Sequence, residues 1–246
     1  MKDQTLLKHL RKCIQEYDLI REGDRIAVGI SGGKDSMILI TGLWMLKRFY
    51  PKHFDLVGII IDPGFSMDYS PIETYFEKLG IPLLIERTEI AKIVFDARKE
   101  PHPCALCSNM RRAALTAAAE RETCGVLALG HHKDDYLSTL FLSLVYEGKF
   151  YTYAPLTEYE DRKIRIIRPL LYVPEAAIEN YVLGKSVPTV KNVCPADGQT
   201  KRQEMQDLIE ELQKRYPKLK DRLLRAVQTS DIPDWVRCSP PGIRDS

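Results

Sequence analysis

The sequence predicts an α/β fold in which helices cover both faces of a parallel β-sheet. Short apolar, β-branched segments alternate with helix-like segments between residues 25 and 148, which is typical of successive βαβ units. The strand-like segments are apolar along their whole length, as expected when both faces of a sheet are covered. The 246 residues, 44% of them hydrophobic, are enough for one large domain with a buried core.

The first elements follow from the spacing of apolar residues. Residues 3–20 carry apolar residues at helical intervals and predict a helix. Residues 25–30 (RIAVGI) predict a buried strand, and residues 36–49 predict a helix with Ser36 near its start. Residues 54–62 (FDLVGIIID) predict a second strand, because β-branched and apolar residues dominate them.

The same alternation continues to residue 148. Pro71 suits the first turn of a helix at residues 70–80, and Gly80 suits its end. The further predicted elements are a strand at 81–88, an alanine-rich helix at 108–122, a strand at 124–130 and a helix at 134–148 that Gly148 closes.

The pattern changes beyond residue 150. Residues 149–163 read as an acidic, tyrosine-rich loop. Residues 162–171 alternate basic and apolar residues and predict a strand that ends at Pro169. Two or three helices are expected after it, and the last residues (SPPGIRDS) are expected to be disordered.

Composition favours a cytoplasmic protein. No run of 18 apolar residues occurs, so we expect no transmembrane helix. The start (MKDQTLLKHLRK) lacks the apolar core of a secretion signal. The net charge of +2 gives little overall attraction for nucleic acid. RNA binding would therefore depend on the basic clusters at 162–168, 200–203 and 214–225, which are otherwise solvated surface.

The segment SGGKDS lies between the first predicted strand and the first helix of the sheet. Backbone N–H groups and the helix dipole make this position an anion site, at the edge where doubly wound sheets bind ligands. Its spacing fits neither the G-x-x-x-x-G-K-[ST] loop nor G-x-G-x-x-G. We expect phosphate binding, rather than an accidental Gly-Ser turn, by Ser31, Gly32, Gly33, Lys34, Asp35 and Ser36.

The arrangement of this segment resembles the pyrophosphate loop of the N-type ATP pyrophosphatases. That family cleaves ATP between the α and β phosphates and adenylates a carbonyl oxygen. The resemblance implies that the end of the second strand (IIDPGF), and with it Asp62, approaches the adenosine. A simple β-turn is the alternative there.

The segment LGHHKDD follows the fourth strand and therefore converges on the same edge of the sheet. Asp134 and Asp135 are candidates for holding Mg²⁺, which favours carboxylate and phosphate oxygens. His131 or His132 is a candidate for contacting phosphate or for exchanging a proton near neutral pH. The alternative is a solvated loop in which Asp134 caps the next helix.

The six cysteines need an explanation other than disulfides in a reducing cytoplasm. Cys104 and Cys107 form a C-x-x-C pair that we expect just before the helix at 108. The helix N-terminus and the nearby Arg111 and Arg112 should lower the pKa of these thiols. Cys194 lies in a loop with proline and glycine before another predicted helix.

The residues alone leave three interpretations of these cysteines open. Three thiolates suit an iron–sulfur cluster with one open iron that can bind sulfur. A structural zinc site needs a fourth ligand, for which His102, Cys124 and Cys238 are the candidates. A metal-free redox pair is the third interpretation.

The motifs also occur in a characteristic order: SGGKDS, C-x-x-C before an Arg-Arg helix, GHHKDD, IRPLLYVPE, and a lone cysteine before KRQEM. Over residues 25–210 this order resembles the tRNA 2-thiocytidine synthetase family. The resemblance implies a Rossmann-like parallel sheet of the adenine-nucleotide alpha hydrolase type, with flanking helices and a short helical C-terminal region. It also implies ATP, Mg²⁺ and a [4Fe–4S] cluster held by Cys104, Cys107 and Cys194.

The resemblance implies ATP-dependent thiolation of cytidine in the tRNA anticodon loop. The expected catalytic residues are Lys34, Asp35, His131, Asp134 and Asp135. The expected partners are tRNA, a sulfur donor (sulfide or a cysteine desulfurase) and a second copy in a homodimer. The implied organisation is an N-terminal helix at 1–24, a pyrophosphate-loop ATPase domain at 25–185, a C-terminal helical segment with the third cluster cysteine at 186–230 and a flexible tail at 231–246.

Two features depart from the family pattern: the chain is short after Cys194, and residues 149–163 are acidic and rich in tyrosine. The motifs therefore define the activation of a carbonyl oxygen better than they define the substrate. One alternative is another ATP pyrophosphatase, either a lysidine-type ligase or a thiolation enzyme for a small molecule. The other is a nucleotide or redox sensor without catalysis.

Overall fold

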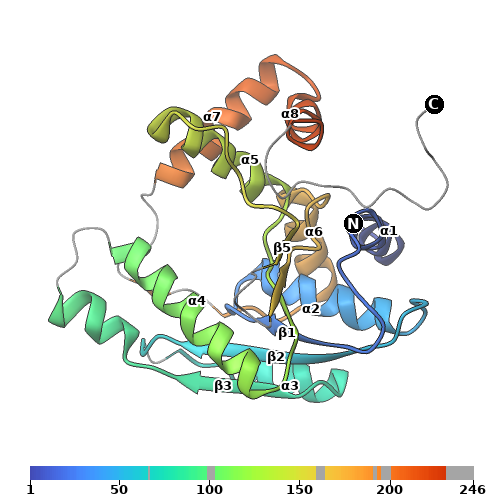
Figure 1. Ribbon diagram of the computed structural model, residues 1–246, viewed down its shortest axis with the longest axis vertical. Helices are drawn as coiled ribbons and strands as arrows, with labels where there is room; N and C mark the ends of the chain where they lie inside the picture. The colour runs from blue at the N-terminus through green and yellow to red at the C-terminus, as the bar shows by residue number, and fades with distance from the viewer. Residues whose placement is uncertain (66, 99–102, 159–163, 191–192, 195–200, 231–246) are drawn as a thin grey trace.

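One six-stranded sheet forms the centre of the computed structural model, which describes all residues except 66, 99–102, 159–163, 191–192, 195–200 and 231–246 (Figure 1). The strand order is β3-β2-β1-β4-β6-β5. Neighbouring strands are parallel except β5, which pairs antiparallel with β6. The strands are β1 (Asp24–Gly29), β2 (Phe54–Asp62), β3 (Leu83–Arg87), β4 (Val126–Ala128), β5 (Leu156–Glu158) and β6 (Arg165–Ile167). The predicted α/β fold with a parallel central sheet is confirmed.

Helices surround this sheet. They are α1 (Asp3–Glu16), α2 (Lys34–Lys47), α3 (Ser70–Leu79), α4 (Pro103–Arg121), α5 (Lys133–Leu142), α6 (Glu175–Lys185), α7 (Lys201–Arg215) and α8 (Leu219–Gln228), with π-helical turns at η1 (Lys92–Ala97) and η2 (Ser143–Glu147). Among the described residues, no helix has both the length and the apolar character that crossing a bilayer requires.

The two faces of the sheet bury different helices. Ile26 and Val28 of β1 lie in the larger core, together with residues of α1, α2, α3, α5 and α6. The intervening Ala27 points to the other face, into the smaller core formed with α4 and η1. Successive residues of one strand are therefore both buried, which explains why the strands are apolar throughout.

Several predicted boundaries agree with the structure. The strand predicted at 54–62 is β2. Helix α3 has Pro71 in its first turn and ends at Gly80, whose φ of 65° is left-handed and favours glycine. The helix predicted at 134–148 is divided into α5 and η2, and Gly148 closes it with φ of 62°.

Two predictions about boundaries were wrong. The alanine-rich helix begins at Pro103 rather than at residue 108. Cys104 and Cys107 therefore lie in its first turns and not before it. Strand β5 lies within residues 149–163, which were expected to form a loop. It has three residues and is defined by its pairing with β6, so no local sequence pattern predicts it.

Candidate functional site

The segment 31–36 connects the carboxyl end of β1 to the first turn of α2. Gly32 has a φ of 84°, a left-handed conformation that glycine adopts without strain. The Ser36 hydroxyl accepts a hydrogen bond from the Ser31 N–H at 3.2 Å and donates to the Gly33 carbonyl oxygen at 2.9 Å. These bonds close the segment into a tight loop at the positive end of the α2 dipole.

The end of β4 approaches this loop closely. A Cβ atom added to Gly130 would lie 3.0 Å from the carbonyl carbon of Asp35 and from the nitrogen of Ser36. Only a residue without a side chain leaves room for this approach. The segment after β4 and the 31–36 loop thus form one site, as the convergence of parallel strand ends predicts.

Lys34 is held by a carboxylate from another element. Its Nζ donates to Glu175 Oε1 at 2.7 Å and lies 3.5 Å from Asp35 Oδ1. Burial alone would lower the pKa of Lys34, but the contacts with Glu175 and Asp35 outweigh it and raise the pKa above its ordinary value. The lysine is therefore charged and aimed at the site. Glu175 opens α6 and follows Pro174, a local sign of a helix start that sequence reasoning did not use.

Asp35 lies in the first turn of α2, beside Lys34. Its Oδ1 is buried and accepts no hydrogen bond from the described residues. Two nitrogen atoms lie near this oxygen, Lys34 Nζ at 3.5 Å and His132 Nε2 at 3.7 Å. Burial raises the pKa of Asp35, and the negative charges of Asp135 and Glu175 add to this effect against the opposing charges of His132 and Lys34.

His132 organises the start of α5. Its Nδ1 accepts the Asp134 N–H at 3.3 Å, and its own backbone N–H donates to Asp135 Oδ2 at 3.0 Å. His132 is thus the N-cap, and the alternative in which Asp134 caps the helix was wrong. Because Nδ1 is an acceptor, the proton of the neutral ring is on Nε2, which faces Asp135 Oδ2 at 3.4 Å and Asp35.

His131 lies against the ring of Tyr153. Its ring lies 4.6 Å from the Tyr153 ring, centroid to centroid. Its Nδ1 is buried and accepts or donates no hydrogen bond within the described part of the chain. Burial, followed by the charges of Arg168 and Arg202, lowers the pKa of His131 well below its ordinary value. The ring is therefore neutral near pH 7, and His132, not His131, lies against Asp35.

Cations from the C-terminal helices engage both aspartates of the HHKDD motif. Lys220 Nζ of α8 donates to Asp134 Oδ1 at 2.5 Å. Arg202 Nη1 of α7 donates to Asp135 Oδ1 at 3.2 Å. Burial would raise the pKa of Asp134, but the bonds from Lys220 and the Glu175 N–H hold it below its ordinary value. No local sequence signal identifies these two cations, because each is more than 60 positions from its partner.

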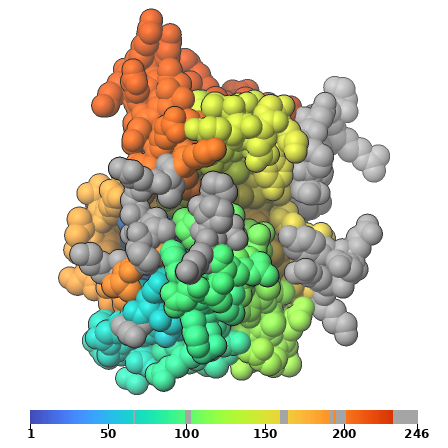
Figure 2. All heavy atoms as spheres, turned by 90° about the vertical axis from the view of Figure 1, so that its left-hand side faces the viewer, coloured from blue at the N-terminus to red at the C-terminus, as the bar shows by residue number. Residues whose placement is uncertain are grey.

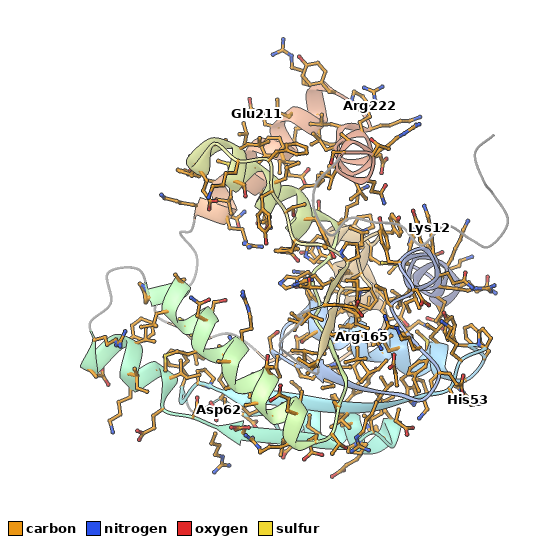
Figure 3. The ribbon with its side chains drawn as sticks, in the orientation of Figure 1. Lys12, His53, Asp62, Arg165, Glu211 and Arg222 are labelled. Atoms are coloured by element: carbon orange, nitrogen blue, oxygen red, sulfur yellow. The ribbon has the colours of Figure 1, made fainter. Side chains whose placement is uncertain are left out.

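Asp62 ends β2, the second parallel strand (Figure 3). Its Oδ1 accepts the N–H of Gly64 at 2.9 Å, and Gly64 has a φ of 97°. The segment IIDPGF therefore does contain the tight turn that was the alternative interpretation. A turn at this strand end also leaves the side chain half-buried at the edge where the other candidate residues lie.

The three candidate metal-binding cysteines come from two segments. Cys104 is exposed, and Cys107 and Cys194 are half-buried. Burial raises the pKa of Cys107, and the charges of Cys194 and Cys104 raise it further, against the opposing charge of Arg111. The predicted lowering of this thiol pKa was wrong, because burial outweighs the arginine. The charges of Cys104 and Cys194 thus both act on the Cys107 thiol.

The structure thus supplies the donor set but not a closed metal site. No group of three His, Cys, Asp or Glu side chains at ligating distances exists within the described residues. Cys13 and Cys124 are buried in the two cores. His102 and Cys238, two of the candidate zinc ligands, lie outside the described residues. Figure 2 shows that α4, the end of α5 and α7 reach the same face of the molecule.

Two of the basic clusters serve the fold. Arg165 donates to both oxygens of Asp24 at 2.6 and 2.8 Å, near the centre of the molecule (Figure 3). Arg168 is buried and donates to the Ala154 carbonyl oxygen at 2.7 Å. Arg202 of the second cluster is paired with Asp135. Of the third cluster, Arg222 on α8 is exposed at the top of the molecule (Figure 3), so it remains available to a polyanion.

Comparisons with known proteins agree on one family. Residues 2–211 match a family model described as a PP-loop domain. The tRNA-cytidine(32) 2-sulfurtransferase of Pelobacter propionicus is 35% identical over 237 residues, which cover 92% of this chain and 87% of the relative. The enzyme of the same name from Geotalea daltonii is 38% identical over 223 residues, which cover 88% of this chain and 87% of the relative.

Solved structures agree on the fold. A U34-tRNA thiolase from Methanococcus maripaludis, solved with its [4Fe–4S] cluster, matches with a TM-score of 0.73 and 24% identity, over 92% of this chain and 77% of that one. The ammonia-dependent NAD synthetase of Campylobacter jejuni matches with a TM-score of 0.50 and 14% identity, over 92% and 93% of the two chains. At these identities the likeness shows a shared α/β architecture.

Proposed function

Since the chain belongs to the PP-loop family and, within it, to the tRNA-cytidine 2-sulfurtransferases, we propose that it is an ATP-dependent tRNA sulfurtransferase. It would replace the C2 carbonyl oxygen of a cytidine in the anticodon loop, at position 32 as in the names of its relatives, by sulfur. The observation that carries the proposal is the joined site of the 31–36 loop and the HHKDD segment. It combines a charged lysine, a helix N-terminus and several carboxylates at one edge of the sheet.

The chemistry would follow from activation of a poor electrophile. The cytidine O2 attacks the α-phosphorus of ATP, and pyrophosphate leaves with the electron pair of the broken P–O bond. A hydrosulfide then adds to C2, and the C2–O bond breaks with AMP as the leaving group. Sulfide supplies sulfur at the oxidation state of the product, so these steps need no reductant.

Lys34 and the N–H groups of the 31–36 loop would bind the phosphates and offset negative charge that develops on them. Binding of phosphate would draw Lys34 from Glu175, its present partner. Asp35 is the best-placed carboxylate for Mg²⁺, because its Oδ1 accepts no hydrogen bond from the described residues. Both oxygens of Asp134 and of Asp135 already accept hydrogen bonds, and Asp35 and Asp135 both lie near His132 Nε2. His132 would orient the carboxylates of Asp35 and Asp135. Neutral His131, with Tyr153, would line the side of the site where the cytidine that accepts sulfur binds.

The remaining residues of the site would shape it and contact the nucleotide. Ser31, Gly32, Gly33 and Ser36 shape the loop, and Asp62 would approach the adenosine.

Cys104, Cys107 and Cys194 would hold a [4Fe–4S] cluster, with zinc as the less favoured occupant. The donor set fits in kind, because thiolates are the usual ligands of a [4Fe–4S] cluster and three cysteines leave one of its four irons without a protein ligand. When bound, such a cluster supplies an open iron coordination position for sulfur. The neighbouring Arg111 faces Cys107 and is a candidate for contacting RNA phosphate.

The proposed partners are tRNA, a sulfur donor and a second copy of the chain. The donor is sulfide itself, or a cysteine desulfurase whose persulfide sulfur a thiol reductant releases as sulfide. The location is the cytoplasm, where tRNA is available and thiols stay reduced. The target cytidine must be turned out of the loop, as single-stranded RNA bases are in sequence-specific recognition.

The test is a single-turnover and steady-state assay under anaerobic conditions. Reconstituted protein is incubated with Mg²⁺, ATP, sulfide and a tRNA with cytidine at position 32. The matched substrate has uridine there. We expect 2-thiocytidine, AMP and pyrophosphate in equal amounts with the first tRNA only. AMP without a thionucleoside would indicate another PP-loop reaction, and ATP binding without AMP release would indicate a sensor.

A further inference from the structure

The C-terminal helices are joined to the candidate ATP site by ion pairs. Figures 1 and 3 show α7 and α8 at one end of the molecule, next to α5. Lys220 of α8 contacts Asp134, Arg202 of α7 contacts Asp135, and Asp221 of α8 contacts Lys133. Three consecutive residues in the first turn of α5 are therefore each paired with the α7–α8 hairpin.

Asp134 is fully engaged in this junction. Its side chain is only 9% exposed. Oδ1 accepts from Lys220 Nζ at 2.5 Å, and Oδ2 accepts from the Glu175 N–H at 2.7 Å. The carboxylate thus joins α5, α6 and α8. A buried charge of this kind is stable only while its partners stay in place, so Asp134 has the contacts of an anchor rather than of an open metal ligand.

The segment that carries Cys194 is attached on both sides of the cysteine. Before it, the Val190 N–H donates to the Gly32 carbonyl oxygen at 2.8 Å, in the 31–36 loop itself. After it, α7 begins at Lys201 and is fixed at once by the Arg202–Asp135 pair. The cysteine therefore lies between two attachments to the site that would bind ATP.

We propose that Lys220 is a positioning residue and that Asp134 is the anchor it holds. The ion pair between Lys220 and Asp134, together with the pair between Arg202 and Asp135, fixes the Cys194 segment relative to the ATP site. The inference rests on the proposed function, since it says which residues couple the activation of the substrate by ATP to the cysteines that would hold the cluster. Its direct consequence is that loss of Lys220 uncouples the two halves of the reaction without weakening magnesium binding.

The competing explanation is that Lys220 fills a magnesium site when the metal is absent. The two explanations predict opposite effects of Lys220→Met. If Lys220 occupied a metal site, its removal would free a carboxylate and lower the Mg²⁺ concentration needed for half-maximal activity. If Lys220 is an anchor, that concentration stays the same and the coupling suffers.

The experiment compares Lys220→Met and Lys220→Arg with the wild type, all as cluster-loaded full-length protein. Lys47→Met is the matched control, since Lys47 forms an exposed pair with Asp55 at 2.7 Å elsewhere on the molecule. For Lys220→Met we expect thiolation kcat to fall at least tenfold, with the KM for ATP and the Mg²⁺ half-saturation within twofold of wild type. AMP formation per thionucleoside should rise. Lys220→Arg should restore most of the kcat, and Lys47→Met should resemble the wild type.

Hydrogen exchange provides a readout that does not need the reaction. Mg²⁺ and ATP should slow amide exchange at Val190 and in the first turns of α7 in the wild type and in Lys47→Met, but not in Lys220→Met. Unchanged kcat and exchange in Lys220→Met would overturn the proposal, as would a lowered Mg²⁺ half-saturation. If the wild type makes no thionucleoside, the proposed function fails, yet the exchange comparison still tests the coupling.

Discussion

At the scale of single residues, Lys34 is the side chain on which the nucleotide chemistry depends most. Lys34→Ala should lower AMP formation at least ~100-fold, because one preorganised charged donor to a developing anion is worth about that much. The fold should be unaffected, since the partners of Lys34 are Glu175 and Asp35 at the site. Rates of AMP release with saturating tRNA and ATP measure the effect.

Lys47→Ala is the control for this experiment, because Lys47 lies in the last turn of the same helix and pairs with the exposed Asp55. It should retain wild-type AMP formation. Retained activity in Lys34→Ala would contradict the assignment of the 31–36 loop to the phosphates.

Two glycines that flank β4 give a second residue-scale prediction. A Cβ at Gly130 would meet the backbone of Asp35 and Ser36 at 3.0 Å, whereas a Cβ at Gly125 would meet nothing within 4 Å. Gly130→Ala should therefore displace the loop and weaken ATP binding by on the order of tenfold to a hundredfold. Calorimetric titration with ATP measures it. Equal affinities in Gly130→Ala and Gly125→Ala would show that the close approach is irrelevant to the nucleotide.

The sequence predicted the chemical groups of this site but not their partners. SGGKDS and HHKDD are local patterns, so their residue types and strand-end positions could be recognised. Glu175, Arg202 and Lys220 reach the site from 141, 67 and 86 positions away from their partners. Only the folded chain brings them there, and they determine which carboxylate oxygens stay open.

At the scale of elements, apolar runs and end signals predicted the segments that carry them. Strand β2 is an apolar run that is buried along most of its length, helix α3 has Pro71 in its first turn and Gly80 at its end, and the predicted limits of both were confirmed. Strand β5 and the early start of α4 depend on pairing and on Pro103. A short strand such as β5 is stabilised by its pairing with a neighbouring strand, so its own residues are not enough to predict it.

The contact between β2 and α3 allows a prediction about stability. A Cβ at Gly58 in β2 would overlap the Phe76 ring of α3 and lie 2.9 Å from Leu83 Cδ1. Gly58→Ala should lower the free energy of unfolding by about 1–3 kcal/mol, the usual cost of overpacking a core. Gly184→Ala, in open space on α6, should instead raise it by up to ~1 kcal/mol through helix propensity. Urea denaturation measures both; a neutral Gly58→Ala would contradict the tight packing.

Helix α1 should make stability depend on pH through His9. Burial, with the charges of Lys8, Lys12 and Lys133, lowers the pKa of His9 in the folded protein. The unfolded chain, with a pKa near 6.5, then binds more protons than the folded chain below that pH. Stability is therefore present above about pH 6.5 and is lost as the pH falls toward the folded pKa.

Unfolding free energies between about pH 7.5 and pH 5 test this dependence. The wild type should lose stability across this range, and His9→Gln should lose less. His131, whose pKa is also lowered, contributes equally to both proteins. His53→Gln, at a ring that is 91% exposed, is the control and should keep the wild-type slope. Identical slopes for wild type and His9→Gln would refute the role of His9.

At the scale of the whole molecule, the sheet gathers donors that are far apart in the chain. Cys104 and Cys107 lie at the start of α4, on the side of the smaller core, and Cys194 lies after α6, which packs on the larger core. The cluster would therefore join two layers of the fold. Its formation should depend on Cys194 as much as on the C-x-x-C pair, although Cys194 belongs to a different segment.

Cys194→Ala should reduce the iron content of anaerobically reconstituted protein from about four per chain to below about one, with a matching loss of labile sulfide and visible absorption. Cys13→Ala, at a thiol buried in the larger core, should keep its iron, although it will lose some stability.

Iron removal by a chelator should lower the melting temperature of the wild type but not of Cys194→Ala, because only a bound group stabilises the folded state. Stoichiometric zinc in place of iron, or full iron in Cys194→Ala, would contradict a cluster held by these three cysteines. Either result would leave the ATP site intact and require a different route for sulfur.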